Sequence, residues 1–443
     1  MSSVIQLLVD LIKINSINPF TSERNEDEWI LGGNETEICN FLESKLNLYG
    51  FRVTRQYVHT DKRGKEYFNL LAEKGKGSKS ILFYAHTDTV TANPWKDEKT
   101  ALTPKFDKME VYGELTDILI GLGANDMKAG IAIICEAVKD LDPDDYKIKV
   151  AFGVDEEFYS LGSNTLVNSD FMNDVMAIVV PEIGDGPNRF CGVSTLGIGR
   201  LGRCELKINI HGTGGHGAIS YDPDFINAAH EASKLAIEIE NLRLNYRDNF
   251  KFYENVVPDL DAVDNLNGSF YISRIDAGDG TLSIPSKAEM ILDFTLTPNR
   301  TIEESKKMIE DLINKLYGDG TLRKVYIGGE FKKITVEYRD RPTPYSEAYL
   351  TGEKNCFTAY LRDIIDNHFG FYNYNMGYSV ADENVFKKNF PQIPVIVSGP
   401  IGWNSHKENE WVSIKSVEEL VILYRETAKN FGDYLKRVQS LSD

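Results

Sequence analysis

Short apolar runs rich in β-branched residues alternate with helical stretches over the first part of the chain. Three of these runs, at residues 80–84, 147–154 and 175–180, are predicted to be buried strands, and residues 128–141 have a helical pattern. Because consecutive parallel strands need helical crossovers, the alternation predicts a mostly parallel sheet flanked by helices. The carboxyl ends of such strands meet at one edge of the sheet, which is where ligand sites collect.

The pattern changes after residue 199. Alternating half-buried strands are predicted at residues 201–211, 268–275, 288–297 and 333–338, with helices at 224–239 and 301–316. This order predicts a small α+β unit in which two helices cover one face of a sheet. Residues 241–264 are charged and aperiodic, and they are predicted to form a loop. Helix and buried strand then alternate again, with a strand at 394–398 and a terminal helix at 417–435.

The return of the first pattern near the end predicts a smaller domain inserted into a larger one. A length of 443 residues exceeds the usual size of a single hydrophobic core, which agrees with two domains. We expect residues 1–196 and 341–443 to form one α/β domain. Residues 197–340 are expected to form the inserted α+β domain, of ferredoxin-like type.

Composition restricts the partners and the compartment. The net charge of −18 argues against nucleic acid or an anionic membrane as a partner, because both would repel the surface. The five cysteines are widely spaced without a C-x-x-C pair, which is typical of free thiols in a reducing compartment. No apolar run approaches the roughly 20 residues that span a bilayer, and the first residues do not form a signal-peptide pattern. A cytoplasmic protein is expected.

A histidine and an aspartate follow the first predicted buried strand. The strand delivers His86 to its carboxyl end, and Asp88 stands two positions later. Asp88 could accept the proton of one imidazole nitrogen and so direct the other nitrogen at a metal ion. A His-x-Asp pair alone is more often a satisfied polar pair than a metal site. Further ligands are needed to decide between the two interpretations.

Carboxylates occupy the equivalent ends of the neighbouring strands. Asp155, Glu156 and Glu157 are consecutive after one strand, and Glu182 follows the next. Adjacent carboxylates repel one another, so they are tolerated at an exposed turn or around a cation. Because parallel strands share an edge, His86, Glu157 and Glu182 are expected to converge.

Two more candidate ligands lie outside these strands. Asp126 precedes the helix at 128–141, where it could be a helix N-cap or could bridge two cations with its two oxygens. The glycines around it lack the spacing of a nucleotide-binding loop. His406, one of seven histidines, follows the strand at 394–398. Two histidines and three carboxylates suit a pair of zinc ions about 3.5 to 4 Å apart.

Taken together, these motifs resemble the M20 family of dizinc peptidases and amidohydrolases, which includes acetylornithine deacetylase, succinyl-diaminopimelate desuccinylase and the aminoacylases. The resemblance extends in order over essentially the whole chain. It implies that His86 and Glu182 hold one zinc, that Glu157 and His406 hold the other, and that Asp126 bridges them. It also implies that Glu156 is the general base and that Asp88 orients His86. The family tends to carry a cis peptide after the bridging aspartate, so the bond between Asp126 and Met127 is a candidate.

The predicted insertion carries a further family motif. Residues 211–218 look like the lid motif, which implies that His216 donates to the developing oxyanion. Many members also grip a substrate carboxylate with a lid asparagine and a strand-end arginine, but Leu282 and Thr295 stand at these places. Arg274 or Arg300 could substitute, or the substrate could lack a carboxylate there. The lid often mediates dimerisation in the family, so a homodimer through this domain is expected.

The resemblance implies a metal-dependent hydrolase that cleaves an amide bond in a small N-acyl amino acid or related metabolite, of deacetylase or desuccinylase type. Hydroxide held by the zinc pair would attack, with Glu156 as the general base. Cobalt or manganese could replace zinc, because the same ligands accept several metals. Two alternatives stay open: a dipeptidase or carboxypeptidase of the same family, and a catalytically silent metal-binding relative.

Overall fold

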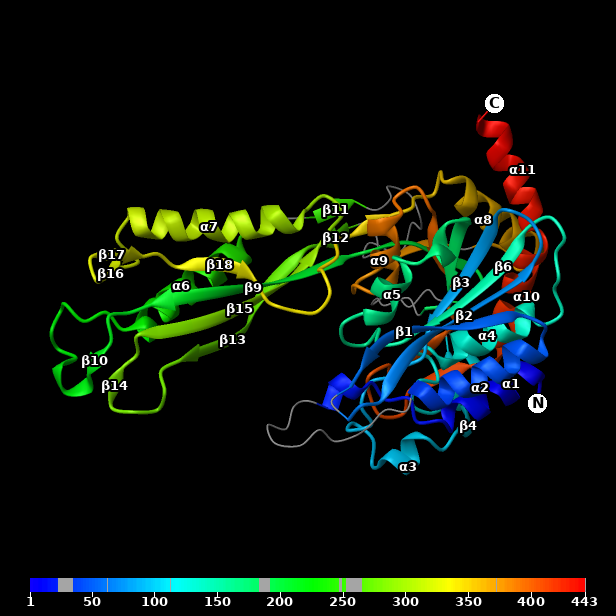
Figure 1. Ribbon diagram of the computed structural model, residues 1–443, viewed down its shortest axis with the longest axis horizontal. Coiled ribbons are helices and arrows are strands. Elements are labelled where there is room, and N and C mark those ends of the chain that lie inside the picture. The colour runs from blue at the N-terminus through cyan, green and yellow to red at the C-terminus, as the bar shows by residue number, and fades with distance from the viewer. Residues whose placement is uncertain are drawn as a thin grey trace. The chain divides into compact units, whose positions relative to one another are not determined.

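The computed structural model describes residues 1–22, 35–61, 63–111, 113–182, 192–246, 249–251, 265–371 and 373–442. These residues form a mixed α/β protein with a large sheet and helices (Figure 1). The chain divides into two compact units. The first unit comprises Met1–Arg200 and Leu350–Asp443, and the second unit comprises Leu201–Tyr349.

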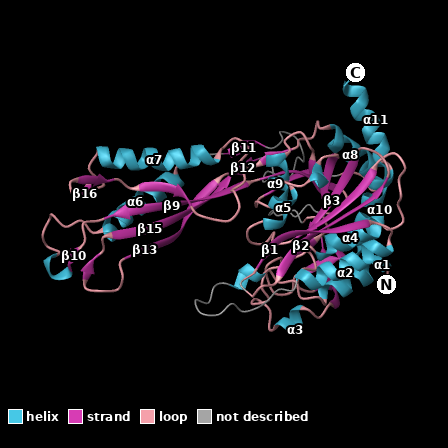
Figure 2. Cartoon of the chain, viewed as in Figure 1, coloured by secondary structure: helices cyan, strands magenta, loops and turns pink. Residues whose placement is uncertain are grey.

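The main sheet of the first unit has a parallel centre. Figure 2 draws its strands in magenta among the cyan helices of that unit. Its strands lie in the order β1 (Arg52–Thr60), β2 (Glu66–Gly75), β6 (Lys147–Gly153), β3 (Ser80–His86), β7 (Val175–Val180), β21 (Val395–Val397), β8 (Thr195–Arg200) and β19 (Tyr349–Leu350), and β20 (Asn373–Gly377) also pairs with β8. Strands β6, β3, β7 and β21 run parallel to one another. The pairs β1–β2, β2–β6 and β21–β8 are antiparallel. Every residue of β3 is buried, as its apolar sequence predicts for a strand covered on both faces. The carboxyl ends of the central strands therefore share one edge.

Helices cover this sheet. Helix α4 (Lys128–Val138) packs against α1 (Ser3–Ile12) and α10 (Ile414–Lys429), and nearly all of its residues are buried. The other helices of the first unit are α2 (Glu35–Leu48), α3 (Glu98–Ala101), α5 (Leu161–Leu166), α8 (Cys356–His368), α9 (Asp382–Asn389) and α11 (Phe431–Ser442). The single terminal helix predicted at 417–435 is interrupted at Asn430. The Asn430 side-chain amide donates to the Glu426 carbonyl at 3.0 Å and ends α10 there.

The first unit also contains a small second sheet that the sequence patterns did not predict. Its order is β22 (Gly402–Trp403), β23 (Trp411–Ser413), β5 (Glu114–Ile120) and β4 (Lys105–Val111). Strand β23 pairs antiparallel with β5, with Trp411 opposite Ile120. Both side chains are buried in an apolar cluster with Trp95. This pairing places the hairpin between β22 and β23 beside the loop that follows β5.

The second unit is an antiparallel sheet with its own core. Strands lie in the order β13 (Ser269–Ala277), β15 (Lys287–Leu296), β9 (Gly202–His211) and β18 (Thr335–Tyr338), and the helices are α6 (Ala228–Leu244) and α7 (Ile302–Gly318). Alternate residues of β9 are buried, and they pack with apolar residues of both helices. Thr301 and Glu304 form a capping box at the start of α7. The short strands are β10 (Gly215–His216), β11 (Asn249–Lys251), β12 (Asn265–Asn267), β14 (Ser283–Ile284), β16 (Val325–Ile327) and β17 (Glu330–Lys332).

The borders of the two units differ from the expected 197 and 340. Strand β8 belongs to the main sheet through its pairing with β20 and β21, so the chain leaves the first unit only after Arg200. On the return, Arg203 donates from its backbone to the Ser346 carbonyl at 3.0 Å, which holds that segment in the second unit. The loop predicted at 241–264 falls mostly outside the described residues; Asn241–Leu244 continue α6.

Two further observations concern the cysteines and the length of the apolar helices. Among the described residues, Cys39, Cys135, Cys204 and Cys356 are free thiols, and Cys191 lies outside the described ranges. No helix in the described part of the chain combines the length and the apolar character needed to cross a bilayer.

Candidate metal centre

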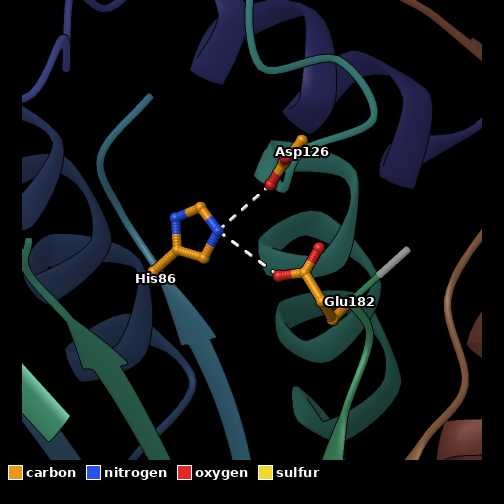
Figure 3. A group of neighbouring side chains, drawn as sticks. All are labelled: His86, Asp126 and Glu182. Atoms are coloured by element: carbon orange, nitrogen blue, oxygen red, sulfur yellow. Dashed lines mark hydrogen bonds and ion pairs between the residues drawn. The ribbon is translucent and has the colours of Figure 1, made fainter. Parts of the chain in front are cut away.

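His86 ends β3 and lies among carboxylates at the edge of the main sheet (Figure 3). Its side chain is buried, and its Nε2 atom lies 3.2 Å from Asp126 Oδ1 and 3.4 Å from Glu182 Oε2. On the other side of the ring, Nδ1 lies 3.0 Å from the backbone carbonyl of Asp88 and 3.4 Å from its carboxylate. The ring is thus held through Nδ1, while Nε2 faces two acidic side chains.

A second group forms around His406, in the hairpin between β22 and β23. His406 Nε2 lies 3.3 Å from Asp126 Oδ2 and 3.1 Å from Glu157 Oε2. In each group of three residues the potential ligand atoms all lie within 4.8 Å of one another. Asp126 belongs to both groups and presents a different oxygen to each histidine. The peptide bond between Asp126 and Met127 is cis, in agreement with the family resemblance.

Asp88 holds the turn that carries the acidic residues after β6. Its carboxylate accepts hydrogen bonds from the backbone N–H groups of Glu156 and Glu157, at 3.1 and 3.0 Å. The Asn18 side chain donates to Asp88 and to Asp155, both at 2.8 Å. Asp155 has a positive φ of 62°, so the turn is tightly bent. Asp88 therefore positions this turn as well as the His86 ring.

Glu156 lies beside the two groups but belongs to neither. Burial raises the pKa of its carboxyl well above the ordinary value; the charge of His86 opposes this shift, and the charge of Asp382 adds to it. Asp382 is buried at the start of α9 and accepts hydrogen bonds from the hydroxyls of Tyr84 and Ser163. A carboxyl with a raised pKa in this position is suited to accept and release a proton.

The centre has a high density of negative charge. Burial raises the pKa values of Glu157 and Glu182 to about 7, and the nearby charge of Asp126 adds to both shifts. Hydrogen bonds with Asp126 and Glu157 raise the pKa of His406 to about 12. For His86, burial would lower the pKa, but hydrogen bonds with the surrounding carboxylates outweigh it and raise the pKa well above the ordinary value. Such a site is stabilised by protons or by bound cations.

We expect the affinity of this centre for zinc to increase as the pH rises from about 6 to 8. Without metal, the raised pKa values of Glu157, Glu182 and the two histidines keep protons on these groups near neutral pH. Metal binds the deprotonated forms, so each proton released adds about one unit to the slope of log K against pH. Calorimetric titration of zinc into metal-free protein across this pH range measures the affinity. Repeating the titration in buffers of different ionisation enthalpy measures the number of protons released.

The same shifts predict the opposite trend for the stability of the metal-free protein. The two glutamates have folded pKa values of about 7 against an ordinary value of 4.5, so the folded chain binds more protons than the unfolded chain. Their contribution to stability is therefore present below about pH 4.5 and is lost as the pH rises through 7. A zinc affinity that does not change with pH would contradict the expectation that these groups hold protons in the metal-free protein.

The structure places His216 in the second unit, in the short strand β10. Gly215 and His216 pair with Ile284 and Ser283 of β14, and His216 is exposed. Its Nδ1 atom accepts a hydrogen bond from the backbone N–H of Ala218 at 3.1 Å. The free Nε2 atom is thus the one that could donate to a ligand.

The other candidate substrate contacts also lie in the second unit. Leu282 is 85% exposed, and Thr295 lies in β15. Arg274 is exposed and forms an ion pair with Asp276, while the Arg300 guanidinium lies over the Tyr246 ring, 5.8 Å from its centre. Both arginines therefore have local partners within their own unit.

Three polar side chains that support the centre were missed from the sequence: Asn18, Asp382 and Glu410. Asn18 donates to Asp88 and Asp155, and Asp382 accepts from Tyr84 and Ser163, as described above. Glu410 accepts hydrogen bonds from the backbone of the loop that carries Asp126. Glu410 and Asp126 are 284 positions apart. Local pattern does not reveal such contacts, although Glu410 lies in the same hairpin as His406.

The chain is similar to known proteins over most of its length. The chain matches peptidase family M20/M25/M40 over residues 82–430. Acetylornithine deacetylase of Proteus mirabilis (strain HI4320) is 27% identical over 405 residues, which cover 89% of this chain and 89% of that protein. Succinyl-diaminopimelate desuccinylase of Pelagibacter ubique (strain HTCC1062) is 24% identical over 433 residues, covering 96% and 98% respectively.

The fold is shared with solved structures. A tripeptidase from Staphylococcus aureus superimposes with a TM-score of 0.64 at 17% identity, covering 96% of this chain and 97% of that one. The family match spans well over half of the chain, and the relatives align along most of its length. The chain therefore belongs to peptidase family M20/M25/M40 and is a hydrolase of the metallopeptidase and amidohydrolase type.

Proposed function

We propose that the enzyme hydrolyses an amide bond in a small N-acyl amino acid or related metabolite, with Glu156 as the general base. The observation that carries the proposal is the arrangement of two ligand groups that share Asp126, with Glu156 beside them and outside both. A carboxyl that is close to the metal ligands without being one is free to move protons.

The residues fit a pair of zinc ions. Both groups combine an imidazole nitrogen with carboxylate oxygens, which is a donor set that zinc accepts. Oε1 of Glu157 is buried and has no hydrogen-bond partner among the described residues, as expected for an atom that faces a cation. His86 and Glu182 would hold one ion, Glu157 and His406 the other, and Asp126 both. Cobalt or manganese would fit the same donors.

When bound, the metal pair polarises the scissile carbonyl and lowers the pKa of water near it. Glu156 takes a proton from the attacking water and later delivers it to the leaving amine. Asp88 and Asn18 fix the turn on which Glu156 stands, through the hydrogen bonds at 2.8–3.1 Å. We assign to His216 the donation of a hydrogen bond to the developing oxyanion, which matches its exposed position and free Nε2 atom.

In this proposal the first unit carries the metal ligands and Glu156, and the second unit is the lid that carries His216.

We propose a cytoplasmic homodimer that associates through the second unit. Strand β13 is an edge of its sheet, and the Tyr271 and Ile275 side chains on it are 53% and 47% exposed. An apolar exposed edge of this kind is suited to pair with a second copy.

The names of the relatives support an acyl-amino-acid substrate of deacetylase or desuccinylase type. A peptide is the second candidate substrate, as for a dipeptidase or carboxypeptidase, because solved structures that share the fold include a carboxypeptidase and a dipeptidase. Leu282 and Thr295 replace the polar lid residues common in the family, so a substrate carboxylate would need other partners.

The two substrate classes can be separated with a panel of N-acetyl amino acids, N-succinyl amino acids and dipeptides. We expect zinc-loaded protein to hydrolyse an N-acyl amino acid with kcat/KM at least roughly 10-fold above that for any dipeptide. Release of free amine measures the reaction, with metal-chelated protein as the control. Faster cleavage of a dipeptide would favour the peptidase alternative. No hydrolysis by protein that retains both metal ions would favour a silent relative.

A further inference from the structure

We propose that Glu410 is a positioning residue that holds the shared ligand Asp126 in place and thereby sets the affinity for both metal ions. The inference rests on the proposed metal centre and adds a residue that belongs to neither ligand group.

One buried carboxylate receives three backbone N–H groups of this loop. Oε1 of Glu410 accepts from Asn125 at 2.8 Å and from Asp126 at 2.9 Å, and Oε2 accepts from Gly123 at 2.9 Å. The Glu410 side chain is only 1% exposed. Without this carboxylate, the three amides would be buried and unpaired, at a cost of about 1–3 kcal/mol for each group. The loop would then adopt another conformation or admit water.

The small second sheet explains how Glu410 reaches this loop. Glu410 directly precedes β23, whose pairing with β5 places Trp411 opposite Ile120 at the start of the loop. The backbone N–H of Gly121 also donates to the Glu410 carbonyl at 3.0 Å. A side chain on Gly402 would come within 2.2 Å of Asn125 Oδ1, so the hairpin and the loop are in close contact. The pairing of β23 with β5 therefore places the Glu410 carboxylate against the loop that carries Asp126.

The same hairpin also carries the metal ligand His406. The hairpin therefore supplies His406 as a ligand. Through Glu410 it also supports a second ligand, Asp126. Asp126 is the residue for which small displacements matter most, because its two oxygens serve different metal ions. Outer hydrogen bonds that orient metal ligands typically change metal affinity by about 10- to 100-fold when they are removed.

Hydrogen bonds along the loop favour the same role. Three backbone N–H groups compensate for the burial of the Glu410 side chain. Lys128, which follows the loop, is buried; its backbone N–H donates to the Gly123 carbonyl at 2.9 Å, and its side chain donates to the Ile14 carbonyl at 2.8 Å. The loop is thus held at Gly123, Asn125 and Asp126 by backbone hydrogen bonds, which limits the motion of Asp126.

Glu410→Gln and Glu410→Ala test the proposal, with Glu231→Gln as the matched control. Glu231 is also a buried glutamate that accepts a backbone N–H, from Arg323 at 2.9 Å, but it lies in the second unit. Zinc affinity and stoichiometry are measured by competition with a chromophoric chelator, well below the melting temperature of each variant. The visible absorption spectrum of the cobalt-loaded proteins reports ligand geometry independently of activity.

We expect Glu410→Gln to bind both ions about 10-fold more weakly and Glu410→Ala about 100-fold more weakly, with altered cobalt spectra. The amide oxygen of Gln can still accept from Asn125 and Asp126, so it retains part of the effect. Glu231→Gln should bind both ions as the wild type does. Wild-type affinity and an unchanged spectrum in Glu410→Gln would overturn the proposal, even if its melting temperature falls. If the wild-type protein bound no metal, the proposed function itself would fail.

Discussion

Replacing Glu156 by alanine is expected to reduce kcat roughly 100- to 10,000-fold while both metal ions remain bound. The carboxyl lies beside the two ligand groups without belonging to either, so its loss removes no metal ligand. Its environment raises its pKa, because burial disfavours the charged carboxylate. A group with these properties supplies proton transfer, and the attack of water on an amide is slow without it.

Steady-state hydrolysis of the preferred N-acyl amino acid and metal analysis by mass spectrometry check this result together. Glu156→Gln should be as inactive as Glu156→Ala, because an amide cannot accept the proton. Glu408→Gln is a suitable control, since Glu408 is an exposed glutamate of the hairpin that carries His406. Near-full activity of either Glu156 variant would refute the general-base assignment. Loss of one metal ion would instead make Glu156 a ligand.

Replacing Asp126 by alanine is expected to eliminate binding of both metal ions, and with them all turnover. Asp126 faces His86 with Oδ1 and His406 with Oδ2, at 3.2 and 3.3 Å, and no other residue belongs to both ligand groups. Its removal also leaves Glu157 and Glu182 without the cations that would balance their charges. A buried acidic site of this kind retains protons in preference to weakly held metal.

The metal content of three variants after dialysis distinguishes shared from individual ligands. Asp126→Ala should retain neither ion. Glu182→Ala should lose mainly the ion next to His86, and His406→Ala mainly the ion next to Glu157. Circular dichroism establishes that each variant is folded. Two ions in Asp126→Ala would show that the two groups do not share a ligand, and equal losses in all three variants would show that the ions bind only as a unit.

Most of the centre was predictable because its ligands follow strongly patterned strands. His86, Glu157 and Glu182 come directly after, or close to, the ends of β3, β6 and β7, which are apolar and easily recognised. Parallel pairing of these strands places their carboxyl ends at one edge, so convergence follows from the pattern alone. Asp126 and His406 were added as candidates from their places before a helix and after a strand, and the resemblance to the M20 family, which the family match confirms, implied the role of each ligand.

The supporting contacts were not predictable in the same way. Asn18, Asp382 and Glu410 are polar residues in irregular segments or at a helix start, without a periodic pattern around them. Each acts on groups far away in the sequence, as Asn18 does on Asp155, 137 positions later. The sheet that contains β5 and β23 joins segments almost three hundred residues apart, and β23 has only three residues. Such short strands carry too little pattern to be recognised.

The amino-acid sequence by itself determined the α/β class, the buried strands and the positions of the candidate ligands, because hydrophobic periodicity is a local property that side chains express wherever they lie. Only the tertiary structure decided which oxygen of Asp126 faces which histidine, how Asp88 and Asn18 hold the turn of Glu156, and which carboxylate supports the Asp126 loop. These arrangements depend on hydrogen bonds between distant segments. Their partners are selected by distance and burial after the sheets have formed, and not by spacing along the chain.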